Sequence, residues 1–294
     1  MSRILCFGEV LFDVYPEYQR LGGAPLNFAY HLHQLQQTVA FVSRIGDDEN
    51  GNAVLQQLSS HQFPTDMIQT DPQHPTGTVQ VTLDEQAVPS FDIVEDVAYD
   101  HIQKNTKVDQ FLQEGIDLFY VGTLAQRGAV SQQTVKQILA LIPPSASVFY
   151  DINLRPPFYT MEIIEQTLQK STIVKLNKDE FDILKKNFAA KGEEVDAAQQ
   201  LMERFDVDLC ITKGGQGGVY YSLSRSSGCS YQVTPASDVV DTVGAGDGFA
   251  AMLCYGILQK QPMEEVLGRA SRFAVEVCRV SGALPEVAIY SHYS

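Results

Sequence analysis

The sequence has 294 residues, of which 44% are hydrophobic and 10% aromatic, and its formal net charge is −15. This composition is typical of a globular protein with enough residues for one large domain or two domains. The negative charge argues against nucleic acids and anionic membranes as partners, and no apolar run is long enough to span a membrane.

Cysteine and histidine spacing excludes several kinds of site. The five cysteines are scattered and never form a C-x-x-C pair, so we interpret them as reduced thiols of a cytoplasmic protein. The N-terminus enters a strand pattern at once and lacks a small-residue cleavage site, so no leader is expected. The six histidines lack the spacing of ligand pairs, so we expect no histidine-based metal site.

Short apolar runs alternate with amphipathic segments along most of the chain. The runs predict buried strands over Ile4–Phe7, Val39–Val42, Leu118–Val121, Val148–Tyr150, Ile173–Leu176 and Leu209–Ile211. The segments between them predict helices over Leu26–Leu35, Ala53–Leu58, Val130–Leu141, Ile163–Leu168 and Ala197–Phe205. This alternation predicts an α/β fold with a mostly parallel sheet covered by helices on both faces. Without repeats or linkers, we expect a single domain over residues 1–294.

One stretch of the N-terminal third departs from this alternation, and two other segments there carry candidate site residues. Gly77–Asp84 alternates apolar and polar residues, and Val88–Val94 follows after a short turn, which predicts an antiparallel hairpin. The hairpin is either a flap over a cleft or an edge of the sheet. In GGAPLN, Gly22 and Gly23 precede a proline that can start a helix. The segment GEVLFD ends at Asp13, whose carboxylate can accept two hydroxyl hydrogens.

Three motifs follow predicted strands in the second half of the chain. Asn177 and Glu180 in VKLNKDE have the spacing of a capping box at a helix start. ITKGGQGGVYY lacks the G-x-G-x-x-G spacing of a dinucleotide site, and a strand rather than a helix follows it. Arg155 in DINLRPPFY lies after a strand, where it can hold a phosphate or a substrate oxygen, or form a structural ion pair.

The segment DTVGAGD, from Asp241 to Asp247, directly precedes a predicted helix over Gly248–Leu258. A small-residue turn that opens a helix presents unpaired N–H groups and the positive end of the helix dipole to an anion. Asp247 in the same turn can take a proton from a hydroxyl group beside that anion. A tight turn with an acid that stabilises the helix is the alternative.

Together these segments resemble the ribokinase-like (phosphofructokinase-B type) family of carbohydrate kinases and are most similar to bacterial fructokinases. The segments occur in the family's order over nearly the whole chain. The resemblance implies a ribokinase-like α/β domain with a small β-strand lid, contributed by about residues 9–24 and 76–97. It also implies transfer of the γ-phosphate of ATP to a sugar hydroxyl. A lid edge strand can pair with a second subunit in this family, so a homodimer through the lid is conceivable.

The resemblance also implies a role for each motif residue. Asp247 would be the base, and the amides of Gly244, Ala245 and Gly246 would stabilise charge on the transferred phosphoryl group. The residues implied to bind the sugar are Asp13, Gly22, Gly23, Asn27 and Arg155. Those implied to bind the nucleotide are Asn177, Thr212, Gly214 and Gly217.

Two ions are implied beside ATP. Glu180, with Asn177, would help to place Mg²⁺ and its waters on the phosphates. Backbone carbonyls around Asp241 and Val243 could hold K⁺, as in many members of the family.

The acceptor sugar is less well specified. Ribokinases carry a lysine where this chain has Ala24, whereas GGAP and RPPFY are typical of fructokinases, so we expect fructose. Leu26 replaces the small residue of most relatives and leaves the shape of the acceptor pocket open. The alternatives are a 2-keto-3-deoxygluconate kinase or another sugar or nucleoside kinase. From a different class, a non-catalytic sugar-binding or regulatory protein on the same fold also stays open, and an NAD oxidoreductase does not fit.

Overall fold

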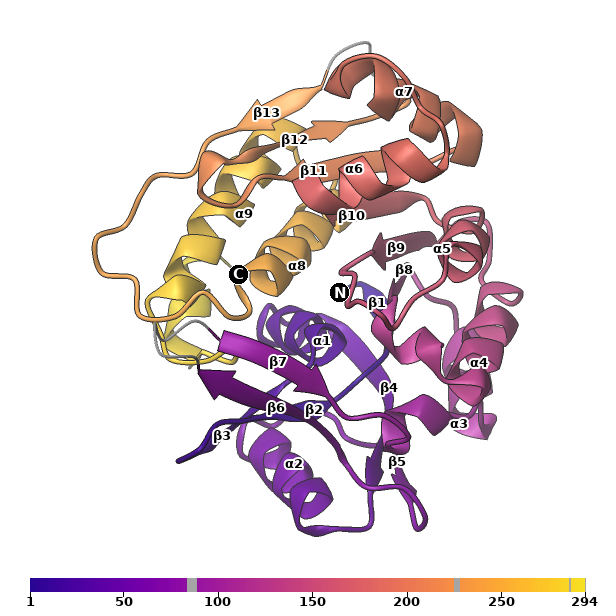
Figure 1. Ribbon diagram of the computed structural model, residues 1–294, viewed down its shortest axis with the longest axis vertical. Helices are drawn as coiled ribbons and strands as arrows, with labels where there is room; N and C mark the ends of the chain where they lie inside the picture. The colour runs from indigo at the N-terminus through magenta and orange to yellow at the C-terminus, as the bar shows by residue number, and fades with distance from the viewer. Residues whose placement is uncertain (84–88, 225–227, 286, 294) are drawn as a thin grey trace.

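The computed structural model describes residues 1–83, 89–224, 228–285 and 287–293. Its main feature is a nine-stranded sheet that crosses the molecule (Figure 1). The strands, in spatial order, are β13 (Cys229–Tyr231), β12 (Gly218–Tyr221), β11 (Asp208–Thr212), β10 (Ile173–Asn177), β9 (Ser147–Asp151), β8 (Leu118–Gly122), β1 (Arg3–Phe7), β4 (Thr38–Gly46) and β5 (Ile68–Asp71). The run from β11 to β5 is parallel, and β12 and β13 add two antiparallel strands.

Helices cover both faces of this sheet. One face carries α3 (Thr106–Gln113), α4 (Ala129–Leu139), α5 (Met161–Leu168), α6 (Lys178–Asn187) and α7 (Glu194–Phe205). The other carries α1 (Ala24–Gln34), α2 (Glu49–Ser60), α8 (Ala245–Leu258) and α9 (Met263–Cys278). The described residues also form the 3₁₀ turns η1 (Ala98–His101), η2 (Leu124–Arg127), η3 (Gly214–Gln216) and η4 (Val287–His292).

The mostly parallel sheet covered on both faces is therefore confirmed. Buried strands such as β8, in which every residue is buried, explain why the sequence shows continuous apolar runs rather than alternation. The sequence did not predict β5 or α3, because their apolar residues are few. Among the described residues, no helix has both the length and the apolar character needed to cross a membrane.

A second, four-stranded sheet lies against the first in the order β3 (Gln19–Gly22), β2 (Leu11–Val14), β6 (Gly77–Leu83), β7 (Pro89–Ile93). β6 and β7 pair antiparallel, with Val81 opposite Phe91, which confirms the predicted hairpin. The predicted ends of its strands, Asp84 and Val88, lie outside the described residues. We call this second sheet the lid.

The segment GEVLFD spans the break between a strand of the central sheet and a strand of the lid. The first strand of the central sheet, β1, ends at Phe7, and Leu11–Val14 forms the separate lid strand β2. Gly8 separates the two strands with a φ of 155°. A Cβ atom on Gly8 would lie 2.3 Å from Cγ of Pro25, so only glycine allows the chain to pass α1 here. Asp13 therefore belongs to the lid rather than to the central sheet.

Candidate active site

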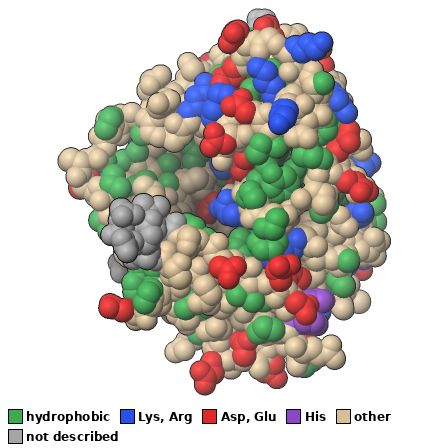
Figure 2. Space-filling view, viewed as in Figure 1, with side chains coloured by type: hydrophobic (Ala, Val, Ile, Leu, Met, Phe, Trp, Pro, Cys, Tyr) green, Lys and Arg blue, Asp and Glu red, His purple; other side chains and the backbone are tan. Residues whose placement is uncertain are grey.

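A cavity of about 640 Å³ lies between the lid and the carboxyl ends of the central strands. The face in Figure 2 is hollowed there, between the lid below and strands β10 to β13 above. Carboxyl ends of parallel strands are the usual place for ligands in α/β proteins. The predicted site residues that line this cavity are Asp13, Gly22, Gly23, Asn27, Arg155, Asn177, Glu180, Thr212, Val243, Gly244, Gly246 and Asp247.

The turn before α8 presents a helix N-terminus to this cavity. Gly244 is the N-cap residue, with a φ of 79°, and no side chain caps the helix. A Cβ atom on Gly244 would lie 2.4 Å from that of Ala283, so the turn requires glycine. The Ala245 amide donates to the carbonyl of Thr242 over 3.3 Å, and Gly246 borders open space. The N-terminus is therefore open to an anion chiefly at Gly246.

Asp247 lies in the first turn of α8, and its carboxylate faces the cavity. The side-chain amide of Asn27 donates to its Oδ2 over 2.7 Å. Burial, followed by the negative charge of Asp151, raises the pKa of Asp247 to about 6 against the stabilising hydrogen bond from Asn27. A carboxyl group with this pKa is ionised at neutral pH and is a stronger base than an ordinary aspartate.

A buried ion pair lies beside the open helix N-terminus. The ammonium group of Lys175, on β10, lies 2.9 and 3.0 Å from the two carboxylate oxygens of Asp151, on β9. Burial disfavours the charged lysine, but Asp151 raises its pKa above the usual value. A Cβ atom placed on Gly246 would have the Lys175 ammonium as its nearest neighbour, at 3.9 Å. The turn thus has a fixed positive charge next to its free amide.

The residues expected to bind a sugar meet on the lid side of the cavity. Asp13 Oδ2 would lie only 3.2 Å from a Cβ atom on Gly22, so the glycine makes room for the carboxylate. Burial raises the pKa of Asp13 against the attraction of Arg155 and Arg20. Asn27 Oδ1 is buried and finds no hydrogen-bond partner among the described residues. This oxygen is an acceptor that a ligand hydroxyl can satisfy.

Arg155 extends into the same cavity from the loop after β9. Its side chain is exposed, and its Nη1 donates to the neighbouring carbonyl of Leu154 over 3.1 Å. The ion pairs found within the described ranges do not include Arg155, which removes the structural ion pair as its role.

Asn177 and Glu180 form the capping box that their spacing predicts. Asn177 Oδ1 accepts the amide of Glu180 over 2.9 Å, and Glu180 Oε2 accepts the amide of Asn177 over 2.7 Å. The other oxygen of Glu180 accepts the amide of Leu154. Burial raises the pKa of this carboxyl group. The capping box and a role at the cavity are compatible, because both residues also line its wall.

A second cavity, of about 460 Å³, continues from the first past Thr212, Thr242 and Gly246. Its walls are mostly apolar and include Gly214 and Ala245. Gly217 lines neither cavity. Its φ is 87°, and a Cβ atom there would lie 2.1 Å from the carbonyl oxygen of Tyr231, so it allows two strands to approach each other.

Asp241 also lines neither cavity. Its Oδ2 accepts a hydrogen bond from Nη1 of Arg20, on lid strand β3, over 2.5 Å, and its Oδ1 accepts the amide of Val243 over 3.1 Å. This side chain therefore links the lid to the turn before α8. Val243 borders the first cavity.

Sequence reasoning missed three charged residues of the cavity: Glu9, Asp151 and Lys175. Lys175 interrupts an otherwise apolar strand, and Asp151 ends one, so a search for charges within buried runs would have found both. Glu9 is nearly fully buried, and its Oε2 has no hydrogen-bond partner within the described ranges. Burial raises its pKa to about 7.

The chain was compared with known proteins. It is 28% identical over 278 residues to the putative sugar kinase PH1459 of Pyrococcus horikoshii, covering 92% of this chain and 82% of that protein. It is 24% identical to a fructokinase of Escherichia coli, covering 96% of this chain and 95% of the relative. The solved structure of a fructokinase with bound ATP from Xylella fastidiosa superimposes with a TM-score of 0.84 at 23% identity, covering 99% and 98% of the two chains.

A family model covers almost the same extent. Residues 1–287 match the model of the pfkB family of carbohydrate kinases, so the match includes both the lid and the turn before α8. The sequence resemblance is confirmed by this match and by the shared fold. The chain belongs to the pfkB family of carbohydrate kinases.

Proposed function

We propose that this chain transfers the γ-phosphoryl group of ATP to a hydroxyl group of fructose. The observation that carries the proposal is the position of the Asp247 carboxylate. It lies between the uncapped N-terminus of α8 and Asn27, whose acceptor oxygen Oδ1 is unpaired among the described residues. An anion on one side of this carboxylate and a sugar hydroxyl on the other would bring the reacting atoms together.

In the proposed reaction, the sugar oxygen attacks the γ-phosphorus of ATP. A new O–P bond forms, the bond from the phosphorus to the β–γ bridging oxygen breaks, and ADP leaves with the electron pair. Asp247 accepts the hydroxyl proton, and a pKa of about 6 suits this task at neutral pH. The amide of Gly246 and the Lys175 ammonium would stabilise charge on the transferred group.

The second cavity would hold the base of the nucleotide. Its walls include Val233, Pro235 and Phe249, which suit a planar ring, and Thr212 and Gly214 lie where the two cavities meet. The fructokinase from Xylella fastidiosa was solved with bound ATP, which supports the same ligand here. The phosphates would then point through the junction towards Asp247.

Glu180 and Asn177 would help to hold Mg²⁺ through water. Both Glu180 oxygens already accept backbone amides, but each keeps a lone pair for a water hydrogen. Mg²⁺ would neutralise part of the phosphate charge in this acidic cavity. The K⁺ site proposed at Asp241 and Val243 would use backbone carbonyls.

Fructose is proposed because two of the relatives are named fructokinases. The motifs GGAP and RPPFY agree with this acceptor. A 2-keto-3-deoxy acid is the runner-up, since Arg155 is free of ion pairs within the described residues and could bind a carboxylate. For the acid, Arg155→Ala should raise KM by at least about tenfold, because a charge-assisted hydrogen bond is lost. For fructose, the change should be smaller.

The test is an ADP-release assay with a panel of sugars and sugar acids. We expect turnover with fructose, and we expect Asp247→Asn to lower kcat by about 10²- to 10⁴-fold. The control is Asp182→Asn, an exposed aspartate on α6 that should leave kcat unchanged. Sugar binding without turnover would instead support the non-catalytic alternative. Mutant activity near that of the parent would remove Asp247 as the base.

A further inference from the structure

Two histidines and an aspartate from two connecting segments, β5–β6 and β7–α3, meet at the root of the lid, outside the cavity described above. The residues are His74, between β5 and β6, Asp96, just after β7, and His101, the last residue of η1. One ligand atom from each lies within 4.8 Å of the other two. We propose that this cluster is a binding site for a divalent transition-metal ion of the Zn²⁺ class.

The distances within the cluster suit such an ion. Asp96 Oδ1 lies 3.0 Å from Nε2 of His101 and 3.6 Å from Nε2 of His74. Zn²⁺ bonds to nitrogen and oxygen are about 2.1 Å long, so two ligands of a tetrahedral site lie about 3.4 Å apart. The 3.6 Å separation is too long for a hydrogen bond, so an ion would supply the missing link between His74 and Asp96.

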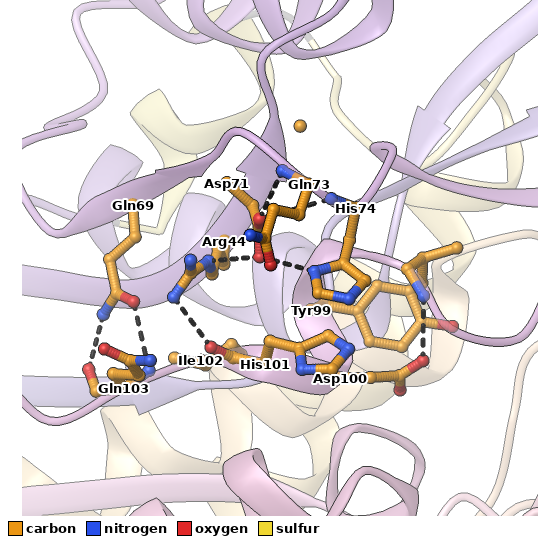
Figure 3. A network of polar contacts seen from close by, with 12 residues as sticks. Arg44, Gln69, Asp71, Gln73, His74, Tyr99, Asp100, His101, Ile102 and Gln103 are labelled. Carbon is orange, nitrogen blue, oxygen red and sulfur yellow. Dashed lines mark hydrogen bonds and ion pairs between the residues drawn. The ribbon is translucent and has the colours of Figure 1, made fainter.

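A second carboxylate fixes the orientation of His74. His74 Nδ1 lies 3.0 Å from Oδ2 of Asp71, so its proton is held there (Figure 3). The other ring nitrogen, Nε2, then has its lone pair free on the side of Asp96. A carboxylate behind a ligating imidazole is the usual second layer of a metal site.

The cluster rests on a rigid base. The guanidinium of Arg44, on β4, lies 2.8 Å from Asp71 and donates to the carbonyl of His101 over 3.0 Å (Figure 3). The two imidazole rings are stacked, with centroids 3.6 Å apart. For both lone pairs to converge on one ion, the His101 ring must turn about χ2, a torsion with a broad minimum, while Asp71 holds the His74 ring.

Charge and exposure also favour a cation. Two carboxylates, Asp71 and Asp96, face one guanidinium, so the cluster carries a net negative charge when both imidazoles are neutral. The side chains of His74 and His101 are 23% and 27% exposed and that of Asp96 80%, which leaves an entry path and room for a water as fourth ligand. Imidazole with carboxylate is a donor set that Zn²⁺, Co²⁺ and Cu²⁺ prefer over Mg²⁺.

The spacing of the histidines did not reveal this site, because the ligands lie on two connecting segments that only the folded chain brings together. His74 precedes β6 and Asp96 follows β7, so the ion would join both strands of the lid hairpin at their root. Bound Zn²⁺ should therefore raise the melting temperature of the protein and slow amide exchange in β6 and β7.

The test uses the full chain without a histidine tag, stripped with a chelator and titrated with Zn²⁺ by calorimetry. We expect the parent to bind Zn²⁺, and His101→Ala and Asp96→Asn each to weaken that binding by at least about tenfold. Asp96 has a φ of 55°, which asparagine tolerates, so Asp96→Asn should fold. The matched controls are His292→Ala and Asp92→Asn, both at exposed positions away from the cluster.

A second readout identifies the ligands. Co²⁺ in place of Zn²⁺ should give intense visible absorption in the parent and in both controls, and weak absorption in the two cluster variants. Isotherms that are the same for the parent and the cluster variants would place Zn²⁺ on cysteines or on the acidic cavity, and would overturn the proposal. So would a parent that takes up no Zn²⁺ at submillimolar concentration.

Discussion

Glu9 and Asp247 place two carboxyl groups with raised pKa values in one cavity. Burial raises the pKa of Glu9 to about 7 and that of Asp247 to about 6. Asp247 receives a hydrogen bond from Asn27, whereas Oε2 of Glu9 has no such partner among the described residues. At neutral pH, Asp247 is therefore mostly ionised, while Glu9 carries a proton in a large share of molecules and can then donate to a ligand.

The first prediction concerns Glu9 and stability. Because folding raises its pKa from 4.5 to about 7, the stabilising contribution of its protonated form is complete below pH 4.5 and is lost as pH rises through 7. Glu9→Gln keeps the shape without the charge. The variant should therefore be more stable than the parent at pH 8, by up to about 3 kcal/mol, and similar to it near pH 4.5.

Urea unfolding at pH 5 and at pH 8 checks this expectation. Glu17→Gln, at an exposed position of the lid, is the control and should follow the parent at both values. The difference in unfolding free energy between Glu9→Gln and the parent should grow from pH 5 to pH 8. If it stays constant, folding does not raise the pKa of Glu9.

At the scale of one element, the start of α8 depends on a glycine conformation. Gly244 has a φ of 79° and no room for a Cβ atom, whereas Gly268, inside α9, has only the Arg272 side chain, at 3.5 Å, near the same point. Gly244→Ala should lower stability by about 1–3 kcal/mol and disturb the turn before α8, because strain and a clash coincide. Gly268→Ala should raise stability by about 0.5–1 kcal/mol.

Thermal unfolding and ADP release, measured for both variants, separate the two effects. The activity of Gly268→Ala should equal that of the parent, and that of Gly244→Ala should fall. Equal stability of the two alanine variants would contradict the left-handed conformation of Gly244.

Elements with a strong pattern were predictable from the sequence. The buried runs gave the strands β1, β4, β8, β9, β10 and β11, because strands covered on both faces need apolar side chains throughout. The capping box at Asn177 was also read correctly, because it depends only on residues three positions apart.

Features that depend on contacts between distant residues were not predictable. The pairing of Lys175 with Asp151 joins two strands, and the separation of β1 from β2 depends on Gly8 passing against Pro25. The histidine cluster joins the β5–β6 and β7–α3 connections. Neither local propensity nor spacing carries this information, because each of these contacts is decided by the tertiary fold.

At the scale of the whole molecule, Arg20 and Asp241 connect the lid to the turn before α8. Arg20 Nη1 lies 2.5 Å from Asp241 Oδ2, and the two side chains are only 30% and 15% exposed. The guanidinium also lies over the rings of Tyr15 and Tyr18. This contact would hold the lid over the acceptor side of the cavity.

We therefore expect Arg20→Ala to lower kcat/KM for the sugar by about tenfold, through KM more than kcat, because a partly buried charged hydrogen bond is lost. Asp241→Asn in the same background should add little further loss, which gives a coupling energy of about 1–2 kcal/mol in a double-mutant cycle. Steady-state kinetics of the four proteins measure it. Additive losses would mean that the lid does not depend on this pair.

The hydrogen bond between Asn27 and Asp247 spans 220 positions of the sequence, and helices α1 and α8 pack against each other around it. A growing polypeptide thus has Asn27, the lid and all nine strands of the sheet before it has Asp247. Asn27 gains its carboxylate partner only when α8 folds back onto the first helix. Under the proposed function, phosphoryl transfer would begin only at that point, so activity would report that synthesis has passed α8.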